Sequence, residues 1–172
     1  MKRLASWVAV VVLLFAVATP ARVQPRVRIG VFDSRGIVVA YGQSAAFRAQ
    51  MQQFRAQFEK AKAANDAKLL AELEAKAQTQ QMLLHLQGFS IGSVSEILAN
   101  FKDEVAAVAK QANVSAVVSQ FELAYQDPNV ETVDITEALA KKLNDSPNIP
   151  EMIAELKKEK PLSMLEALRI TD

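Results

Sequence analysis

The sequence predicts an α+β fold in which a long, coiled-coil-like α-helical hairpin projects from a small β body with a closing C-terminal helix. Short apolar runs rich in β-branched residues stand on both sides of the central region, and such runs are typical of strands. Between them, large apolar residues recur at helical spacing over residues 44–87. The chain contains 5 Gly, 6 Pro and no Cys, which favours long helices stabilised by packing or association instead of disulfides.

The N-terminal residues have the pattern of a cleavable export signal. A basic start at residues 1–3 precedes an apolar run over residues 4–18, and small residues at 16–18 or, as a second choice, 19–21 suit cleavage. The run is shorter than the ~20 residues of a spanning helix, although an uncleaved anchor is the alternative. We therefore expect residues 1–21 to be a signal peptide and the mature chain to be periplasmic. Cleavage would change the formal net charge of +1 to about −1, which gives no strong electrostatic preference for a partner.

Two strands are predicted to flank the helical region, and a third to pair with the second. Residues 27–32 alternate between apolar and polar and then become fully apolar, which predicts the first strand. The β-branched residues 37–41 fit either a continued strand or the start of a helix. After a helix over residues 94–112, residues 114–119 form the second strand, and residues 122–125 are predicted as its hairpin partner.

The central helices are predicted from two apolar stripes separated by a polar break. Ser44 is a plausible N-cap for the first helix, and Asn65 with Asp66 interrupts the pattern and caps the second. Two such helices should fold back as an antiparallel hairpin with arms of ~20 residues, or ~30 Å. One continuous helix over residues 44–87 is the alternative. The first stripe consists of Phe47, Met51, Phe54 and Phe58, at spacings typical of a coiled coil.

Capping residues predict where the later helices begin and end. Gly88 suits a left-handed C-cap, and Ser93 with Glu96 has the spacing of a capping box. Asp134 with Glu137 has the same spacing and predicts the closing helix over residues 135–143. Residues 22–144 are expected to form one domain. Residues 145–172 are expected to be a C-terminal extension with a charged helix over 151–158 and an apolar motif at Leu162, Met164, Leu165 and Leu168.

Several short motifs resemble one family of exported proteins. A valine pair at 117–118, Ala-Tyr at 124–125 and Asp-Ile-Thr at 134–136 follow one another, and the helical tip carries Lys-Ala-Ala-Asn-Asp at 62–66. Together with the export signal and the order of elements, these motifs resemble the Skp (OmpH-like) family of periplasmic chaperones over roughly residues 27–144. The arms are shorter and less basic than the family's, so the chain resembles a divergent member.

The resemblance implies a function in holding other proteins. It implies a homotrimer whose strands form a shared β body and whose arms surround a cavity for unfolded outer-membrane or other exported proteins, held without ATP. We expect no catalysis, cofactor, metal or nucleic-acid partner, because no phosphate-binding loop, metal-ligand spacing or basic aromatic face is present. Weak contact with a membrane surface is possible. The alternative is a non-catalytic envelope scaffold that uses its helical arms for one specific partner.

Candidate client-binding residues lie on the predicted arms. Large aromatic side chains and adaptable Met suit promiscuous apolar contacts, and lysines could attract anionic clients or lipid headgroups. The alternatives are that the apolar residues are the interior seam of the hairpin and that the lysines form a solvated helix face. The candidates are Phe47, Met51, Phe54, Phe58, Lys60, Lys62, Lys68, Leu69 and Lys76.

His85 is the only histidine of the chain, and it raises the question of catalysis. Asp33, Ser34 and Arg35 could lie in the same region, and a Ser-His-Asp set is typical of hydrolases. The sequence has no G-x-S-x-G nucleophile motif, however. We therefore expect Asp33 and Arg35 to pair, and His85 to belong to a hydrogen-bonded junction between arm and body.

Overall fold

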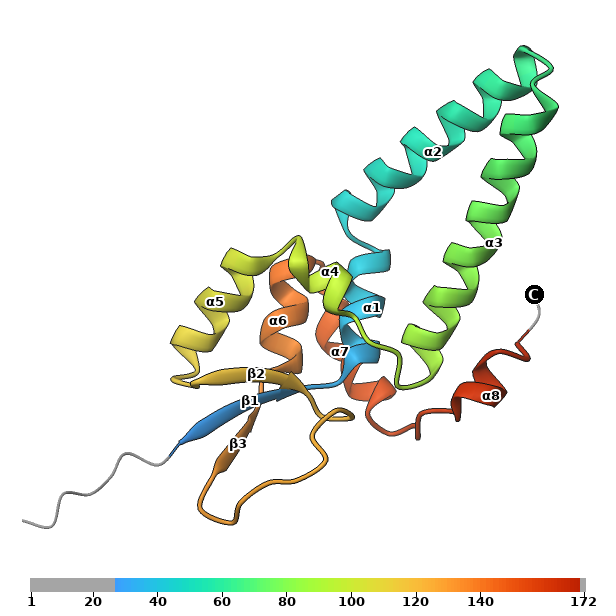
Figure 1. The fold of residues 1–172 in the computed structure, drawn as a ribbon. Coiled ribbons are helices and arrows are strands. Elements are labelled where there is room, and N and C mark those ends of the chain that lie inside the picture. Colours follow the sequence, from blue (N-terminus) through green and yellow to red (C-terminus); the bar gives the residue numbers. More distant parts are fainter. Residues whose placement is uncertain (1–26, 171–172) are drawn as a thin grey trace, which may run out of the picture.

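A computed structural model describes residues 27–170, so the predicted signal peptide lies outside the described residues. Its body is built on a three-stranded parallel sheet of β1 (Arg28–Phe32), β2 (Ala116–Ser119) and β3 (Glu131–Asp134), in the order β2-β1-β3 (Figure 1). The central strand β1 pairs with both neighbours, so that Ile29 lies beside Ala116 on one side and Thr132 on the other. The predicted α+β class is confirmed, and so are the two strands that flank the helical region.

The β-hairpin predicted for residues 114–125 is wrong. Residues 122–125 form no strand, and Tyr125 is 77% exposed. The chain instead loops around to the other side of β1, where β3 runs parallel to it. The backbone of β1 also bonds the residue that follows each neighbouring strand. Phe32 O accepts from Gln120 N, after β2, at 2.9 Å, and Val31 O accepts from Ile135 N, after β3, at 2.9 Å.

The first helix begins as soon as β1 ends. α1 (Ser34–Gly42) is capped by Asp33, whose side chain accepts from Arg35 N at 3.0 Å. Residues 37–41, whose sequence fits either a strand or a helix, are therefore helical. α1 packs closely against the closing helix, because a Cβ at Gly36 would lie only 2.8 Å from the Cγ2 atom of Thr136.

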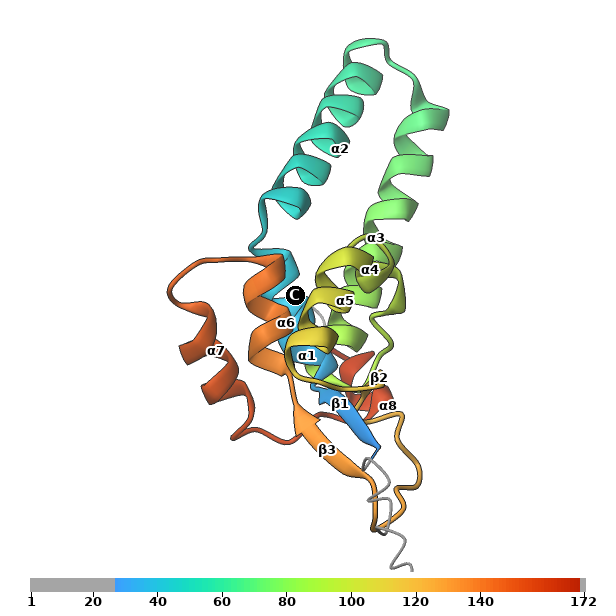
Figure 2. The same cartoon turned by 90° about the vertical axis from the view of Figure 1, so that its left-hand side faces the viewer.

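Two helices, α2 (Ala45–Ala63) and α3 (Ala67–Phe89), extend from the body and meet at a turn (Figure 1). Both predicted N-caps are confirmed: Ser44 Oγ accepts from Phe47 N at 3.1 Å, and Asp66 Oδ1 accepts from Leu69 N at 3.0 Å. Asn65 adopts a left-handed conformation with φ of 51° in the turn between them. Figures 1 and 2 show that the helices are close at this tip and separate toward the body.

The end of α3 differs from the prediction. Gly88 lies inside the helix and not at a left-handed cap, since α3 continues to Phe89 and no described Gly has a positive φ. The turn that follows is held instead by Gln87, whose Nε2 donates to Ser93 O at 2.7 Å. Gly92 is needed here because a Cβ would lie 2.8 Å from Leu86 O.

The single helix predicted over residues 94–112 is divided in two. α4 (Ser95–Ala99) and α5 (Lys102–Gln111) are separated at residues 100–101, where the Nδ2 of Asn100 donates to Glu96 O at 3.1 Å. The predicted capping box of Ser93 and Glu96 does not form, and no side chain caps α4. α5 ends close to the predicted boundary at residue 112, and Asn113 after it is left-handed, with φ of 52°.

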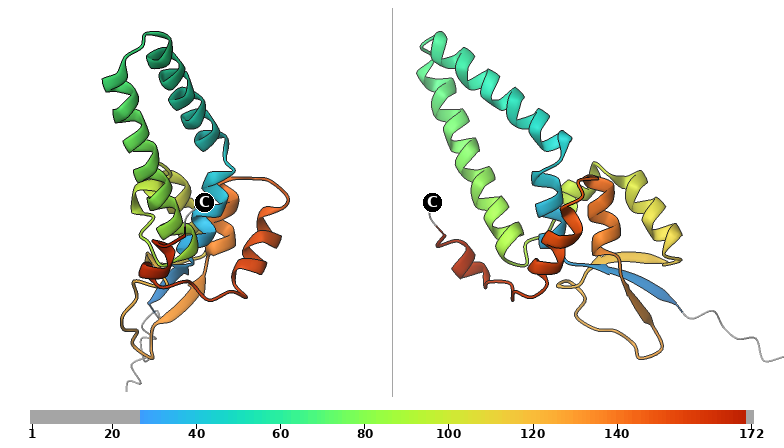
Figure 3. Two further views of the ribbon diagram at one scale, coloured as in Figure 1. Left: turned by 90° about the vertical axis from the view of Figure 1, so that its right-hand side faces the viewer. Right: turned by 180° about the vertical axis from the view of Figure 1, so that it is seen from behind.

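Two further helices complete the body, and a short third one lies beside α3. α6 (Thr136–Leu143) and α7 (Ile149–Leu156) pack with α1, whereas α8 (Met164–Ala167) lies against α3 (Figure 3). The predicted capping box at α6 does not form, since Asp134 Oδ1 accepts from Thr136 N and the Glu137 carboxylate pairs with Lys141. α7 begins earlier than the predicted helix. The core includes Phe32, Ile37, Val38, Ala40, Leu139, Leu143, Ile149 and Ile153, so the C-terminal extension supplies part of it.

Candidate functional site

An apolar groove lies between α2 and α3, on the body side of their tip. Ala61 and Leu73 are buried where the helices are close. Toward the body the separation of the helices leaves the stripe of α2 half-buried, with a groove of about 590 Å³ in front of it. The groove is lined by Val38, Val39, Gly42, Phe47, Met51, Phe54, Ala77, Gln80, Gln81, Leu84, His85, Gly88 and Phe89.

The chemistry of this groove is almost entirely apolar. Its walls come from α2 and α3, and its floor comes from Val38 and Val39 of α1. No Asp, Glu, Lys or Arg lines it, and its polar groups are two glutamines and His85, whose ring centroid lies 5.6 Å from that of Phe89. Aromatic and thioether side chains adapt to ligands of varied shape. The groove is therefore suited to apolar side chains of a flexible ligand.

The structure brings together only some of the predicted client-binding residues. Phe47, Met51 and Phe54 line the groove, whereas Phe58 is half-buried outside it, nearer the tip. Lys60, Lys62 and Leu69 are exposed around the tip. Lys68 is also exposed, and its Nζ lies 4.0 Å from Glu72 Oε1, which fits a solvated helix face.

A second cavity, of about 670 Å³, opens beside the groove and is more polar. It contains Lys76, the last of the predicted lysines, together with Glu96 and Asn100, and shares Gln80 and Leu84 with the groove.

Tyr41 forms part of the wall of this second cavity. Its hydroxyl donates to Gln50 Oε1 at 2.8 Å, and burial raises the pKa of Tyr41. Its ring also packs edge-on against the rings of Phe47 and Phe101. Tyr41 therefore links the first turn of α2 to the body.

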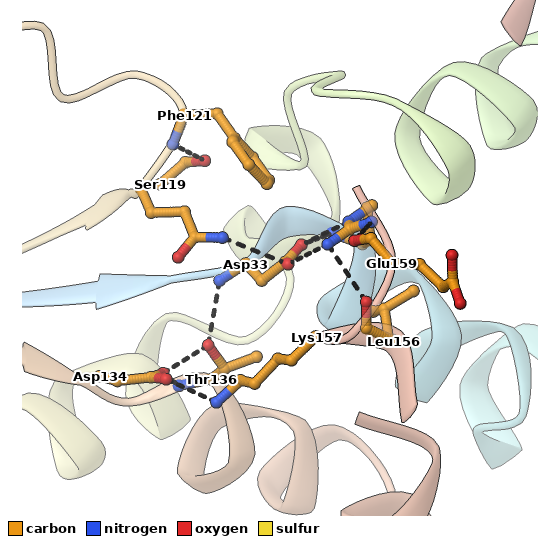
Figure 4. A network of polar contacts seen from close by, with 10 residues as sticks. Asp33, Ser119, Phe121, Asp134, Thr136, Leu156, Lys157 and Glu159 are labelled. Carbon is orange, nitrogen blue, oxygen red and sulfur yellow. Dashed lines mark hydrogen bonds and ion pairs between the residues drawn. The ribbon is translucent and has the colours of Figure 1, made fainter. Parts of the chain in front are cut away.

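A buried polar network lies at the junction of β1 and α1 (Figure 4). Asp33 and Arg35 are paired, as predicted: Nε donates to Oδ1 at 3.0 Å and Nη2 to Oδ2 at 2.7 Å. Gln120 donates to the same carboxylate at 3.2 Å, and Asp33 N donates to Thr136 Oγ1 at 3.0 Å. These contacts connect the first turn of α1 to the loop after β2 and to α6.

Arg35 also reaches the C-terminal extension. Its guanidinium donates to Glu159 O at 3.0 Å and to Leu156 O at 3.4 Å, and it lies 5.7 Å from the ring centroid of Phe121 (Figure 4). Carbonyls at a helix C-terminus attract cations, so Arg35 suits the end of α7. His85 lies in the wall of the groove that residues of α1, α2 and α3 share. The network thus joins body elements, whereas the groove lies between α2 and α3 where the two helices separate.

A second ion pair fixes α7 beside the network. Partial burial favours a higher pKa for Asp134, but hydrogen bonds from Lys157 and Thr136 outweigh it, so the pKa of Asp134 lies below its usual value. Thr136 therefore receives a bond from Asp33 and donates one to Asp134, which couples the two ion pairs through one hydroxyl.

Sequence reasoning missed the groove walls on α1 and at the base of α3. Leu84 has helical spacing from Leu70, Leu73 and Ala77 of the second predicted stripe, and this spacing is the signal available for it. Val38 and Val39 belong to the β-branched run over residues 37–41, and Phe89 follows the predicted helix end at Gly88. Nothing in their local sequence indicates that they face α2.

Comparisons of the chain with protein families, with curated proteins and with solved structures found no match. Within residues 27–170, no helix has both the length and the apolar character that a membrane crossing requires. The same part of the chain holds no group of three or more His, Asp or Glu placed to bind a metal ion.

Proposed function

We propose that the protein is an exported, ATP-independent holdase of the Skp (OmpH-like) type that binds unfolded proteins, outer-membrane proteins among them. The apolar groove between α2 and α3 carries this proposal. Its side chains suit apolar segments, and the absence of charged groups in its lining imposes little sequence preference. In this proposal α2 and α3 act as a projecting helical hairpin, and Phe47, Met51 and Phe54 contact the client.

Association into a trimer would strengthen this binding. A single groove of this size covers only a few side chains, so one arm would bind weakly. Several arms on one particle would raise the apparent affinity without any new kind of contact. The sheet supports such an assembly, because within residues 27–170 β2 and β3 each have one edge without a strand neighbour. Strand pairing between copies would satisfy these edges and remove a site of aggregation.

The lysines of the arm have a secondary role in this proposal. Lys60, Lys62, Lys68 and Lys76 lie on α2 and α3 outside the apolar groove and are exposed. They would attract anionic segments or headgroups weakly and in a salt-dependent manner. Apolar contacts in the groove would then provide most of the affinity.

The first experiment tests aggregation. A urea-unfolded outer-membrane β-barrel protein is diluted into buffer with residues 22–172 of the chain, without ATP, and light scattering is recorded. The proposal expects suppression for this client and for an unrelated unfolded soluble protein. If the chain suppresses the aggregation of neither protein, the holdase proposal is wrong. Tight binding to a single partner instead would favour the scaffold alternative.

A pair of matched variants tests the groove itself. Phe54→Ala removes an aromatic wall of the groove, and we expect client affinity to fall about five-fold, equivalent to about 1 kcal/mol. Phe58→Ala makes the same change on the same helix but outside the groove, and should alter affinity less than two-fold by this reasoning. Equal losses in the two variants would assign binding to the whole stripe and not to the groove.

A further inference from the structure

The apolar groove and the second, more polar cavity meet along one line of α3. Both are lined by Gln80 and Leu84, which lie one helical turn apart and therefore on the same face of α3. The other α3 residues of the groove are Ala77, Gln81, His85, Gly88 and Phe89, and those of the second cavity are Lys76, Thr79, Leu83 and Gln87. On α2 the division continues, because Met51 lines the groove and Gln50 the second cavity. The two cavities thus lie on either side of the opening between α2 and α3.

The second cavity differs from the groove in its chemistry. Most of its lining residues carry an amide, a hydroxyl or a charge, namely Tyr41, Gln50, Lys76, Thr79, Gln80, Gln87, Glu96 and Asn100. The buried Gln87 is held in place, since its Nε2 donates to Ser93 O at 2.7 Å. Among residues 27–170, the side chains of Lys76, Gln80 and Glu96 have no hydrogen-bond or ion-pair partner. The cavity therefore presents polar groups that a ligand can use.

An extended polypeptide has the two kinds of face that these cavities match. Successive side chains of a strand point to opposite sides. A strand lying along the opening would direct every second side chain into the groove and the others into the second cavity. A uniformly apolar strand would bury apolar side chains against the amides and charges of the second cavity, which displaces their water without replacing its hydrogen bonds. Alternation of apolar and polar side chains satisfies both cavities.

We propose that the two cavities form one two-faced site for an extended segment with alternating apolar and polar side chains. The apolar side chains would contact Met51 and Phe54, and the polar ones would bond to Gln80, Lys76 and Glu96. Strands of membrane β-barrels alternate in this way, so they are the segments that the site would prefer. This inference rests on the proposed function and adds to it the sequence pattern of the bound segment.

Two peptides of identical composition test the pattern. Both are short, blocked and fluorescently labelled; one alternates Leu and Ser, and the other carries all its Leu residues before its Ser residues. Fluorescence anisotropy measures the half-saturating concentration of residues 22–172 for each peptide, at concentrations where light scattering shows no peptide aggregation. We expect the alternating peptide to bind about three- to ten-fold more tightly, because its polar side chains gain one or two hydrogen bonds in the second cavity.

A matched pair of variants tests whether the second cavity is responsible for this preference. Gln80→Met keeps an unbranched side chain but removes the amide, so the affinity ratio of the two peptides should fall about two- to five-fold, the effect of one hydrogen bond. Gln53→Met makes the same change at an exposed position of α2 that lines neither cavity, and should leave the ratio at its wild-type value. The ratio cancels any change in apolar contact that both peptides share.

The outcomes separate this inference from the holdase proposal. If both peptides bind equally, or the ratio is the same in Gln80→Met as in Gln53→Met, the second cavity does not select the pattern and the inference is wrong, while the holdase proposal stands. If neither peptide binds, the inference is also wrong, and the aggregation assay decides separately on the holdase. If the alternating peptide is preferred through Gln80 but no aggregation is suppressed, the two-faced site stands and the holdase proposal fails.

Discussion

Replacing Arg35 with Leu is the severest single test of the architecture described above. The Arg35 and Asp33 side chains are 5% and 1% exposed, so the variant leaves a carboxylate out of water without its cation. Two of the bonds to that carboxylate survive, from the backbone N of residue 35 and from Gln120. The bonds from Nε and Nη2 are lost, as are those to Leu156 O and Glu159 O.

The expected cost follows from this inventory. Removing one partner of a buried ion pair destabilises a protein by about 3–5 kcal/mol. Because Asp33 keeps two donors, we expect Arg35→Leu to lie at the lower end, about 3 kcal/mol. For a protein of this size each kcal/mol shifts the melting temperature by about 2–4 °C, so it should fall by about 6–12 °C.

Urea unfolding followed by circular dichroism at 222 nm measures the change, at one protein concentration because association would raise the apparent stability. The matched control is Lys141→Leu, since Lys141 and Glu137 form a pair that is 53% and 51% exposed. Lys141→Leu should lower the free energy of unfolding by less than about 1 kcal/mol. Asp33→Asn/Arg35→Leu, which removes the orphaned charge, should recover part of the loss. If Arg35→Leu is no more damaging than Lys141→Leu, the buried network does not hold the body together.

Two further predictions concern the core and pH. Leu139→Ala, at a side chain with 0% exposure, should lower the free energy of unfolding by about 2–5 kcal/mol, whereas Leu69→Ala at the exposed tip should change it by less than about 0.5 kcal/mol; equal losses would contradict the assigned core. Because the pKa of Asp134 is lowered in the folded protein, its contribution is present above its unfolded pKa of about 3.9 and is lost as the pH falls through the lower folded value. Asp134→Asn should thus be less stable than wild type by about 0.5–1 kcal/mol at pH 7, with the difference shrinking as the pH falls below the unfolded pKa of about 3.9, and a difference that stays constant through this fall would refute the assignment to Lys157 pairing.

Local sequence signals predict where helices and strands lie better than they predict which elements pack or pair with one another. A side-chain oxygen before an apolar periodic run was sufficient to place the starts of α2 and α3 at Ser44 and Asp66. The same reasoning was wrong for the capping boxes at Ser93 and Asp134, where each side chain accepts from the backbone N two residues on instead of three. Ser93 Oγ accepts from Ser95 N at 3.4 Å, and Asp134 Oδ1 accepts from Thr136 N at 2.9 Å.

Strand pairing could not be read from local pattern either. Residues 122–125 contain Glu and Ala, which are disfavoured in strands, and pairing also depends on which edge the preceding loop can reach. Here the loop after β2 carries the chain past β1, and the free side of β1 takes β3. The alternation within β1 predicted a strand correctly, while its central position depends on residues 130–135, about a hundred positions away.

The candidate site shows the same division between local and long-range information. Spacing placed Phe47, Met51 and Phe54 on one face of a helix, but both a sealed seam and an open groove fit that spacing. The structure leaves this face open because α1 lies between the starting point of α2 and the base of α3. α2 follows α1 after a two-residue link, and Gly88 of α3 is close enough to α1 that a Cβ there would lie 3.6 Å from Val38 Cγ1.

The dimensions of α1 account for the width of the groove. At 1.5 Å per residue, the nine residues of α1 span about 13 Å, and the base of α3 packs along them while α2 departs from their C-terminal end. Close helix packing needs 8–10 Å between axes, so the two helices can meet at the tip and cannot at the body. The groove is therefore a consequence of the body's geometry, which makes the buried network of Asp33 and Arg35 at the start of α1 the feature that orients it. By the same geometry, the segment after α7 is bonded through Leu162 to Phe89 and Ser90 at the base of α3, beside the wide end of the groove.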